Sequence, residues 1–157
     1  MSWRVEIRRF HTRDLDRILE IEQASFGPDA WDRDLFLQYS RRCTDLFLVA
    51  RRARRIGGYI ITCVGPRNTE LVSIAVDPRD RLHGLGRGML DETLAQLRSR
   101  RVSAWWLMVA TDNEPAIRFY ENYGFVRTRR SKGYYGTGRD AWRMRFSVKH
   151  SLIVVAQ

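Results

Sequence analysis

The chain contains the segment Val76-Asp-Pro-Arg-Asp-Arg-Leu-His-Gly-Leu-Gly-Arg-Gly88, which joins an expected β-strand to an expected α-helix. The preceding residues 70–76 have a strand pattern, and residues 85–98 carry apolar side chains at helical spacing. Glycine has no Cβ, so the backbone of this turn can approach a bound group closely. Backbone amides and the helix dipole at a helix start favour an anion, so the segment indicates a pyrophosphate site.

Known nucleotide-binding turns differ from this one in their spacing. A P-loop requires Gly-Lys-Ser/Thr, which the segment lacks. A dinucleotide fingerprint requires Gly-x-Gly-x-x-Gly directly after the strand, whereas seven residues separate Val76 from Gly84 and the glycines stand at 84, 86 and 88. Taken alone, the segment also permits a helix start that binds no ligand.

A second motif, Asn113-Glu-Pro-Ala-Ile-Arg-Phe-Tyr-Glu-Asn-Tyr-Gly-Phe125, begins 27 residues beyond Gly86. Together with Arg81-Leu-His-Gly-Leu-Gly86, it resembles the two conserved segments of the GCN5-related N-acetyltransferases, in the order of that family. The resemblance extends over residues 3–146. It implies transfer of an acetyl group from acetyl-CoA to an amine, with no metal. A non-catalytic module that binds acyl-CoA is the alternative from another functional class.

The resemblance also implies a binding site for CoA. The pantetheine arm is expected along a strand, and the pyrophosphate at the glycine turn. The expected CoA-binding residues are Ile74, Ala75, Val76, Arg81, Leu82, His83, Gly84, Leu85, Gly86, Arg87, Asn113 and Tyr120.

Three further segments, 26–31, 71–78 and 132–142, resemble protein N-terminal acetyltransferases, among them enzymes that modify ribosomal protein S18 and their archaeal relatives. This implies a protein or peptide N-terminus as acceptor, with a ribosomal protein among the candidates. An acetyltransferase for a small amine or a lysine is the alternative. The acceptor cleft is expected to include four aromatic residues: Phe26, Trp31, Tyr134 and Tyr135.

Tyr120 occupies the position of the catalytic acid in this family. A phenol with an ordinary pKa of about 10 stays protonated at pH 7 and can supply a proton to a thiolate of pKa about 8.5. The base is less evident, because Met108 stands where related enzymes carry glutamate, and methionine accepts no proton. Glu70 is the remaining candidate, although a solvated charge at a strand end explains it equally well.

The expected fold is α/β, with a mixed and mostly antiparallel sheet of about seven strands and about four helices. The resemblance implies that strands four and five splay apart. We expect one domain over residues 1–157, because the chain has no linker or repeat. Thr12 and Asp32 are expected to begin helices, and Gly124 to end one. The expected strands are 3–10, 45–50, 57–64, 70–76, 104–109, 125–130 and 141–148.

The net charge is +10 and comes mainly from arginine. The arginines are scattered along the chain, which argues against specific nucleic-acid recognition and permits attraction of CoA or an acidic protein. We expect Cys43 and Cys63 to be buried free thiols, because two cysteines make no dense disulfide framework. No apolar run approaches the length of a membrane span, and the N-terminus does not resemble a signal peptide, so a cytoplasmic protein is expected, as monomer or homodimer.

Overall fold

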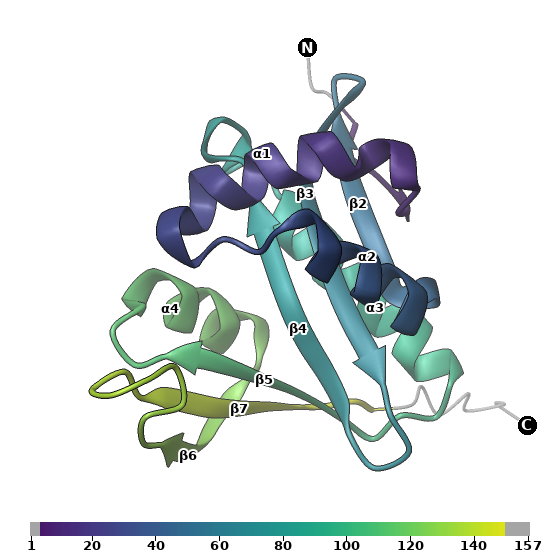
Figure 1. Cartoon of the computed structure of the whole chain (residues 1–157). Coiled ribbons are helices and arrows are strands. Elements are labelled where there is room, and N and C mark those ends of the chain that lie inside the picture. Colours follow the sequence, from purple (N-terminus) through teal and green to yellow (C-terminus); the bar gives the residue numbers. More distant parts are fainter. Residues whose placement is uncertain (1–3, 150–157) are drawn as a thin grey trace, which may run out of the picture. The chain divides into compact units, whose positions relative to one another are not determined.

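The computed structural model describes residues 4–149 (Figure 1). The strands are β1 Glu6–Arg9, β2 Phe47–Arg52, β3 Arg55–Val64, β4 Thr69–Val76, β5 Ala104–Ala110, β6 Val126–Ser131 and β7 Ala141–Ser147. The α-helices are α1 Leu15–Phe26, α2 Arg33–Arg42, α3 Leu85–Ser99 and α4 Glu114–Tyr123. Short 3-10 turns occupy Thr12–Asp14, Gly27–Asp29, Thr44–Leu46 and Pro78–Asp80.

The strands are hydrogen-bonded in the order β1-β2-β3-β4-β5-β7-β6, which makes a seven-stranded sheet. The pairs β1–β2, β2–β3, β5–β7 and β6–β7 are antiparallel. The pair β4–β5 is parallel and has one registered partnership, between Glu70 and Trp106. The mixed α/β class predicted from the sequence is confirmed.

The chain divides into two compact units, and they are described separately below. The first unit comprises Met1–Val64 and Leu71–Thr93, and the second comprises Gly65–Glu70 and Leu94–Gln157. The prediction of a single domain over residues 1–157 stays a prediction.

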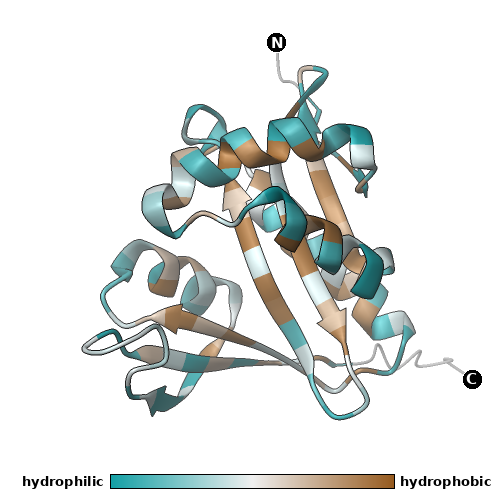
Figure 2. Ribbon diagram, viewed as in Figure 1, coloured by the Kyte–Doolittle hydropathy of each residue, from teal (hydrophilic) through white to brown (hydrophobic). Residues whose placement is uncertain are grey.

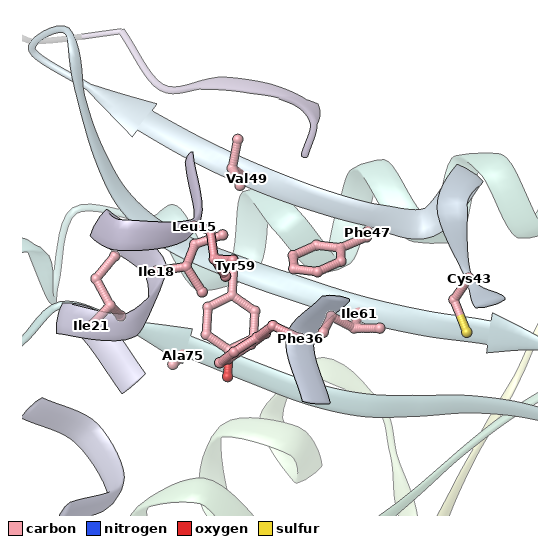
Figure 3. Close-up of a cluster of buried hydrophobic side chains, with 10 residues drawn as sticks. All are labelled: Leu15, Ile18, Ile21, Phe36, Cys43, Phe47, Val49, Tyr59, Ile61 and Ala75. Atoms are coloured by element: carbon pink, nitrogen blue, oxygen red, sulfur yellow. The ribbon is translucent and has the colours of Figure 1, made fainter. Parts of the chain in front are cut away.

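The core of the first unit lies between its sheet and helices α1 and α2 (Figure 3). Brown, apolar positions line the strands under these helices in Figure 2. Alternate residues of a strand point to opposite faces, so Tyr59 and Ile61 face this core while Gly58 faces α3. The core residues are Leu15, Ile18, Ile21, Phe36, Cys43, Phe47, Val49, Tyr59, Ile61 and Ala75.

The core of the second unit forms around Trp105 and Phe125, whose ring centroids lie 5.4 Å apart. Tyr123 of α4 contacts Phe146 of β7 at 5.5 Å. Trp105 and Phe146 are partners in the β5–β7 register, so they share the sheet face against which α4 packs. The opposite face of β5 carries Trp106 and Met108.

Local sequence signals explain several element boundaries. The Asp32 carboxylate accepts a hydrogen bond from the Leu35 amide at 2.9 Å, which confirms it as the N-cap of α2. Gly124 has a φ of 127° and its N–H bonds to the Tyr120 carbonyl, so the predicted stop of α4 is confirmed. Asp14, not Thr12, stands at the N-cap position of α1, because a 3-10 turn occupies Thr12–Asp14.

Two strand predictions need correction. The described first strand begins at Glu6, and the predicted start at Trp3 lies outside the described residues. The expected strands end at 50 and resume at 57, whereas within the run Arg51–Arg55 the turn consists of Ala53 and Arg54, both with positive φ. The hairpin register continues through the pair Arg52–Arg55, so the strands use almost all of that arginine run for pairing.

The prediction of free thiols is wrong. Cys43 and Cys63 form a disulfide across a sequence separation of 20, with their Cα atoms 5.0 Å apart. Cys43 follows α2, and Cys63 lies near the end of β3. The tertiary fold brings the two thiols together, which the spacing of the cysteines in the sequence does not reveal.

Candidate functional site

The glycine turn belongs to the first unit and is fixed from both sides by buried carboxylates. The Asp77 carboxylate caps the turn by accepting from the Arg79 amide at 2.9 Å, and it accepts from the Arg17 guanidinium at 2.5 Å. Asp80, also buried, accepts from Arg55 at 2.7 Å. Hydrogen bonds from Arg79 and then Arg17 hold the pKa of Asp77 well below its usual range. The turn is therefore anchored by ionised side chains.

The end of the turn has the shape that an anion site requires. Gly84 has a φ of 81°, and a Cβ added there would meet no atom within 4 Å. The Gly88 N–H bonds to the Gly84 carbonyl at 2.9 Å, so the amides of Leu85 and Gly86 precede this first bond of α3. Amides at the start of a helix lack intrahelical acceptors and attract anions. These residues fit the pyrophosphate of CoA.

Leu85 and Leu82 have opposite environments within this turn. The Leu85 side chain is 1% exposed and packs beside Gly57, where an added Cβ would lie 2.7 Å from it. Leu82 is fully exposed and has a φ of 66°. The first leucine anchors the helix start, and the second presents an apolar side chain next to the amides.

The segment from Phe26 to Trp31 is held by a buried carboxylate that the sequence analysis missed. The Trp31 N–H donates to Glu22 at 3.0 Å, and the Tyr59 hydroxyl donates to the other oxygen of Glu22 at 2.5 Å. Glu22 is 1% exposed, and burial raises its pKa against these two hydrogen bonds. Trp31 also stacks on Tyr39 with ring centroids 4.9 Å apart.

A signal for this network was present in the sequence. Glu22 lies four residues after Ile18 and next to Ile21, on the apolar side of α1. A carboxylate at such a position is buried and therefore requires partners.

Tyr120 lies in α4 of the second unit. The helix begins at Asn113, whose side chain accepts from the Ala116 amide at 3.3 Å. Tyr120 is 8% exposed, and its ring meets Phe125 edge to face at 5.7 Å. Burial, and then the neighbouring Tyr135, raise the pKa of Tyr120 above its ordinary value. The phenol therefore keeps its proton at neutral pH.

Tyr134 and Tyr135 project from the connection between β6 and β7. Their rings meet edge to face at 4.8 Å, and both remain at least 40% exposed. The connection is closed by the Tyr135 N–H, which bonds to the Arg139 carbonyl at 3.0 Å, and by Asp140, which accepts from the Gly133 amide at 2.8 Å. Burial raises the pKa of Tyr135 to about 12, with smaller contributions that include Glu70.

Glu70 lies at the edge of the second unit where β4 meets β5. It is partly exposed and is the register partner of Trp106, so the two side chains emerge on the same face of the sheet. Met108, two residues further along β5, lies on this face as well.

The predicted site residues are thus divided between the units. The first unit holds Phe26, Trp31, the strand residues 74–76 and the turn residues 81–87. The second unit holds Glu70, Asn113, Tyr120, Tyr134 and Tyr135. Of these, Tyr135 lies within electrostatic range of both Glu70 and Tyr120.

One known family model covers the predicted site residues of both units up to residue 125. The sequence model of the acetyltransferase (GNAT) family matches residues 13–125, which include the glycine turn and Tyr120. The chain belongs to this family. GNAT membership gives the reaction class, transfer of an acetyl group from acetyl-CoA to an amine nitrogen, and confirms the predicted enzyme class and co-substrate.

Individual GNAT relatives support the same assignment. A [ribosomal protein bS18]-alanine N-acetyltransferase of Salmonella typhimurium is 33% identical over 128 residues, covering 82% of this chain and 85% of that protein. An uncharacterised Mycobacterium leprae protein is 38% identical over 143 residues, which cover 84% of this chain and 38% of that protein. The chain therefore spans well under half of this second relative.

A solved GNAT structure shares the fold. Ard1 from Thermoplasma volcanium superposes with a TM-score of 0.87 at 31% identity, covering 93% of this chain and 99% of that one. The prediction of a fold shared with an archaeal acetyltransferase is confirmed.

Proposed function

We propose that this GNAT enzyme acetylates the α-amino group of protein or peptide N-termini. The observation that carries the proposal is the exposed pair Tyr134–Tyr135, which a closed turn presents as two edge-to-face rings. Tyr135 lies within electrostatic range of both Glu70 and Tyr120. Relatives at 31–33% identity are named as [ribosomal protein bS18]-alanine N-acetyltransferases, which supports a protein as acceptor. A ribosomal protein is accordingly one candidate substrate.

Acetyl-CoA supplies the reaction with an acetyl group activated as a thioester. In our proposal, the amides of Leu85 and Gly86 hold its pyrophosphate, aided by the other residues of the turn. The backbone of 74–76 is the proposed partner of the pantetheine amides and the proposed donor to the carbonyl oxygen during attack. Asn113 and Tyr120, in the second unit, are further proposed CoA-binding residues.

Tyr120 is the proposed acid. The amine attacks the thioester carbon, a C–N bond forms, the C–S bond breaks, and the departing sulfur requires a proton. A buried phenol with a raised pKa keeps its proton at neutral pH and can donate it as the C–S bond breaks. Because a thiolate of pKa about 8.5 is a weaker base than the phenolate, the proton transfer is coupled to formation of the amide bond, which drives the step forward.

Glu70 is the proposed base, acting directly or through water, because Met108 on the same face accepts no proton. An α-amine with pKa about 8 is roughly one-tenth neutral at pH 7, whereas a lysine amine of pKa about 10.4 is far less so. A weak base therefore suffices for N-termini. Phe26 and Trp31 of the first unit stay predicted acceptor residues.

A second acceptor class is favoured by one specific observation. Met108 replaces the glutamate of related N-terminal acetyltransferases, so the site lacks the base of those enzymes. A small amine that arrives already neutral, or a lysine deprotonated elsewhere, needs no such base.

The deciding experiment offers acetyl-CoA and peptides of one sequence in two forms. One has a free N-terminus with its lysine blocked, and the other has an acetylated N-terminus with a free lysine. Mass spectrometry locates the added acetyl group. Acetylation of the first peptide alone supports the proposal, and acetylation of the second alone replaces it with lysine transfer. The Glu70→Gln variant, with Glu114→Gln as an exposed control on α4, then tests the base.

Location and assembly belong to the same proposal. None of the helices within residues 4–149 combines the length and the apolar character that crossing a membrane requires. We propose a cytoplasmic enzyme that works as a monomer or homodimer, and size-exclusion chromatography with light scattering distinguishes these two states.

A further inference from the structure

The two units differ sharply in charge. Gly65–Glu70 and Leu94–Gln157 together contain 13 Lys or Arg and 5 Asp or Glu residues, a net charge of +8. The first unit contains 15 Lys or Arg and 13 Asp or Glu residues, a net charge of +2. The excess positive charge of the chain therefore resides in the second unit.

The sheet of the second unit gathers part of this excess on one face. Arg145 is the register partner of Trp106, and Arg143 is the partner of Met108, so both lie on the face opposite α4. On the edge strand β6, Arg129 is paired directly with Arg143. We call Arg129, Arg143 and Arg145 the arginine row.

The arginine row lacks the compensation that neighbouring arginines have. Arg127 pairs with Glu121 at 3.0 Å and Arg130 with Asp140 at 2.9 Å. Within residues 4–149, by contrast, no carboxylate pairs with any member of the row. The Arg143 guanidinium instead lies 3.7 Å from the ring centroid of Trp106, and Arg145 donates to the Ser147 hydroxyl at 2.6 Å.

Such a row is costly for the sheet by itself. Like charges directly opposite each other on antiparallel strands are destabilising, and Arg129 faces Arg143 in this way. Trp106 orients Arg143 on the sheet but leaves its positive charge unbalanced. An anionic ligand would neutralise the row.

The row continues the face of the proposed active site. Glu70, Trp106 and Arg145 are successive register partners across three strands. Neighbouring strands lie about 4.8 Å apart. Arg145, two strands from Glu70, therefore lies about 10 Å from it, and the edge strand that carries Arg129 lies about 14 Å from Glu70. An extended peptide advances about 3.3 Å per residue and covers this span in three to four residues.

From this placement we infer that the arginine row selects acceptor polypeptides with acidic side chains at about the third to fifth residues. The inference rests on the proposed function, because it places the acceptor amine beside Glu70. A peptide is favoured over a nucleic acid because Arg143 covers one face of the Trp106 ring, the surface on which a base would stack. Arg129 is exposed, so a carboxylate can pair with it without displacing that contact.

The test uses free-N-terminus peptides of equal length that share their first two residues. Residues three to five are Asp-Glu-Asp, Ser-Gly-Ser or Arg-Lys-Arg. At low salt, kcat/KM for the acidic peptide should exceed that for the neutral peptide by about tenfold, mainly through KM, and the basic peptide should be poorest. The preference should shrink at 0.5 M salt, where charges on an exposed face are screened.

Arg143→Gln/Arg145→Gln should abolish the preference and leave the neutral peptide unchanged. Arg129→Gln should reduce the preference, and this exposed side chain on an edge strand can be replaced without disturbing the core. The matched control is Arg4→Gln/Arg13→Gln, which removes the same charge from exposed positions of the first unit. Equal kcat/KM for the acidic and neutral peptides, or a preference that survives in the Arg143/Arg145 variant, overturns the inference.

A binding measurement separates this inference from the proposed function. Fluorescence anisotropy with labelled, N-terminally acetylated forms of the same peptides requires no turnover. Tighter binding of the acidic form that depends on Arg143 and Arg145 supports the row even if no peptide is acetylated. Equal binding of all forms overturns it. A single-stranded oligonucleotide that binds the same arginines more tightly than the acidic peptide also overturns it, in favour of nucleic acid. Acetylation of the neutral peptide tests the proposed function alone.

Discussion

The Tyr59 hydroxyl lies 2.5 Å from the carboxylate of Glu22, and both side chains are buried in the core of the first unit. The same hydroxyl lies 2.8 Å from the Ser73 hydroxyl on β4. The second oxygen of Glu22 accepts the Trp31 amide. One carboxylate therefore links α1, strand β3 and the segment that precedes α2.

Glu22→Gln should lower the free energy of unfolding by about 2 kcal/mol, because an amide offers one acceptor oxygen to two buried donors. Since the folded pKa of Glu22 is raised, its contribution is fully present below the unfolded value of 4.5 and is lost as pH rises through the folded pKa. The free energy of unfolding, measured with urea between pH 4 and 7, should therefore depend less on pH in the variant than in the wild type. Tyr59→Phe, which keeps the Trp31 bond, is the control, and parallel profiles for wild type and Glu22→Gln would contradict the prediction.

Asp77→Asn should destabilise the glycine turn by about 2 kcal/mol, because it removes the buried carboxylate partner of Arg17 and leaves that guanidinium paired with the exposed Glu20. The folded pKa of Asp77 is lowered, so its contribution is present above the unfolded value of 3.8 and is lost as pH falls below it. The melting temperature of the wild type should fall steeply as the pH is lowered below 3.8. The melting temperature of Asp77→Asn should fall less over the same pH range, and an equal decrease in both proteins would argue against this role.

Reduction of the Cys43–Cys63 disulfide should lower the unfolding free energy by about 3 kcal/mol, as expected for a closed loop of this length. Guanidinium unfolding with and without reductant measures the difference. The Cys43→Ser/Cys63→Ser variant should match the reduced protein and ignore reductant. No effect of reductant on the wild type would contradict the prediction.

Tyr120→Phe should slow acetyl transfer at least tenfold, within the range typical of losing a general acid. The affinity for CoA should change little, because the ring and its packing against Phe125 remain. Steady-state kinetics and calorimetric titration with CoA make the comparison, with Tyr123→Phe as a control from the same helix. Normal turnover in Tyr120→Phe would remove this residue from the acid role.

Gly86→Trp should abolish CoA binding by filling the space next to the amides at the start of α3. Thermal unfolding tests whether the variant stays folded, and an increase in melting temperature on adding CoA should be seen for the wild type alone. Leu82→Ala, which trims an exposed side chain of the same turn, is the milder control. Undiminished CoA affinity in Gly86→Trp would refute the assignment of the loop.

Local sequence determined much of this protein. Helix starts and stops follow from single residues such as Asp32 and Gly124, because capping acts within one turn of the chain. The two motifs at 81–86 and 113–125 carry the family, since an anion site at a helix start is built from consecutive amides. The order of strands and helices also follows from patterns that are local in sequence.

Only the tertiary structure decided the rest, because it joins residues that are distant along the chain. Cys43 meets Cys63, and Glu22 meets Tyr59, through packing of helices on strands that no spacing rule encodes. The arginines look scattered in the sequence, yet strand register sets Arg129 opposite Arg143 on one sheet face. Register and burial are collective properties of the folded sheet, and they determine which charges are paired and which are left for a partner.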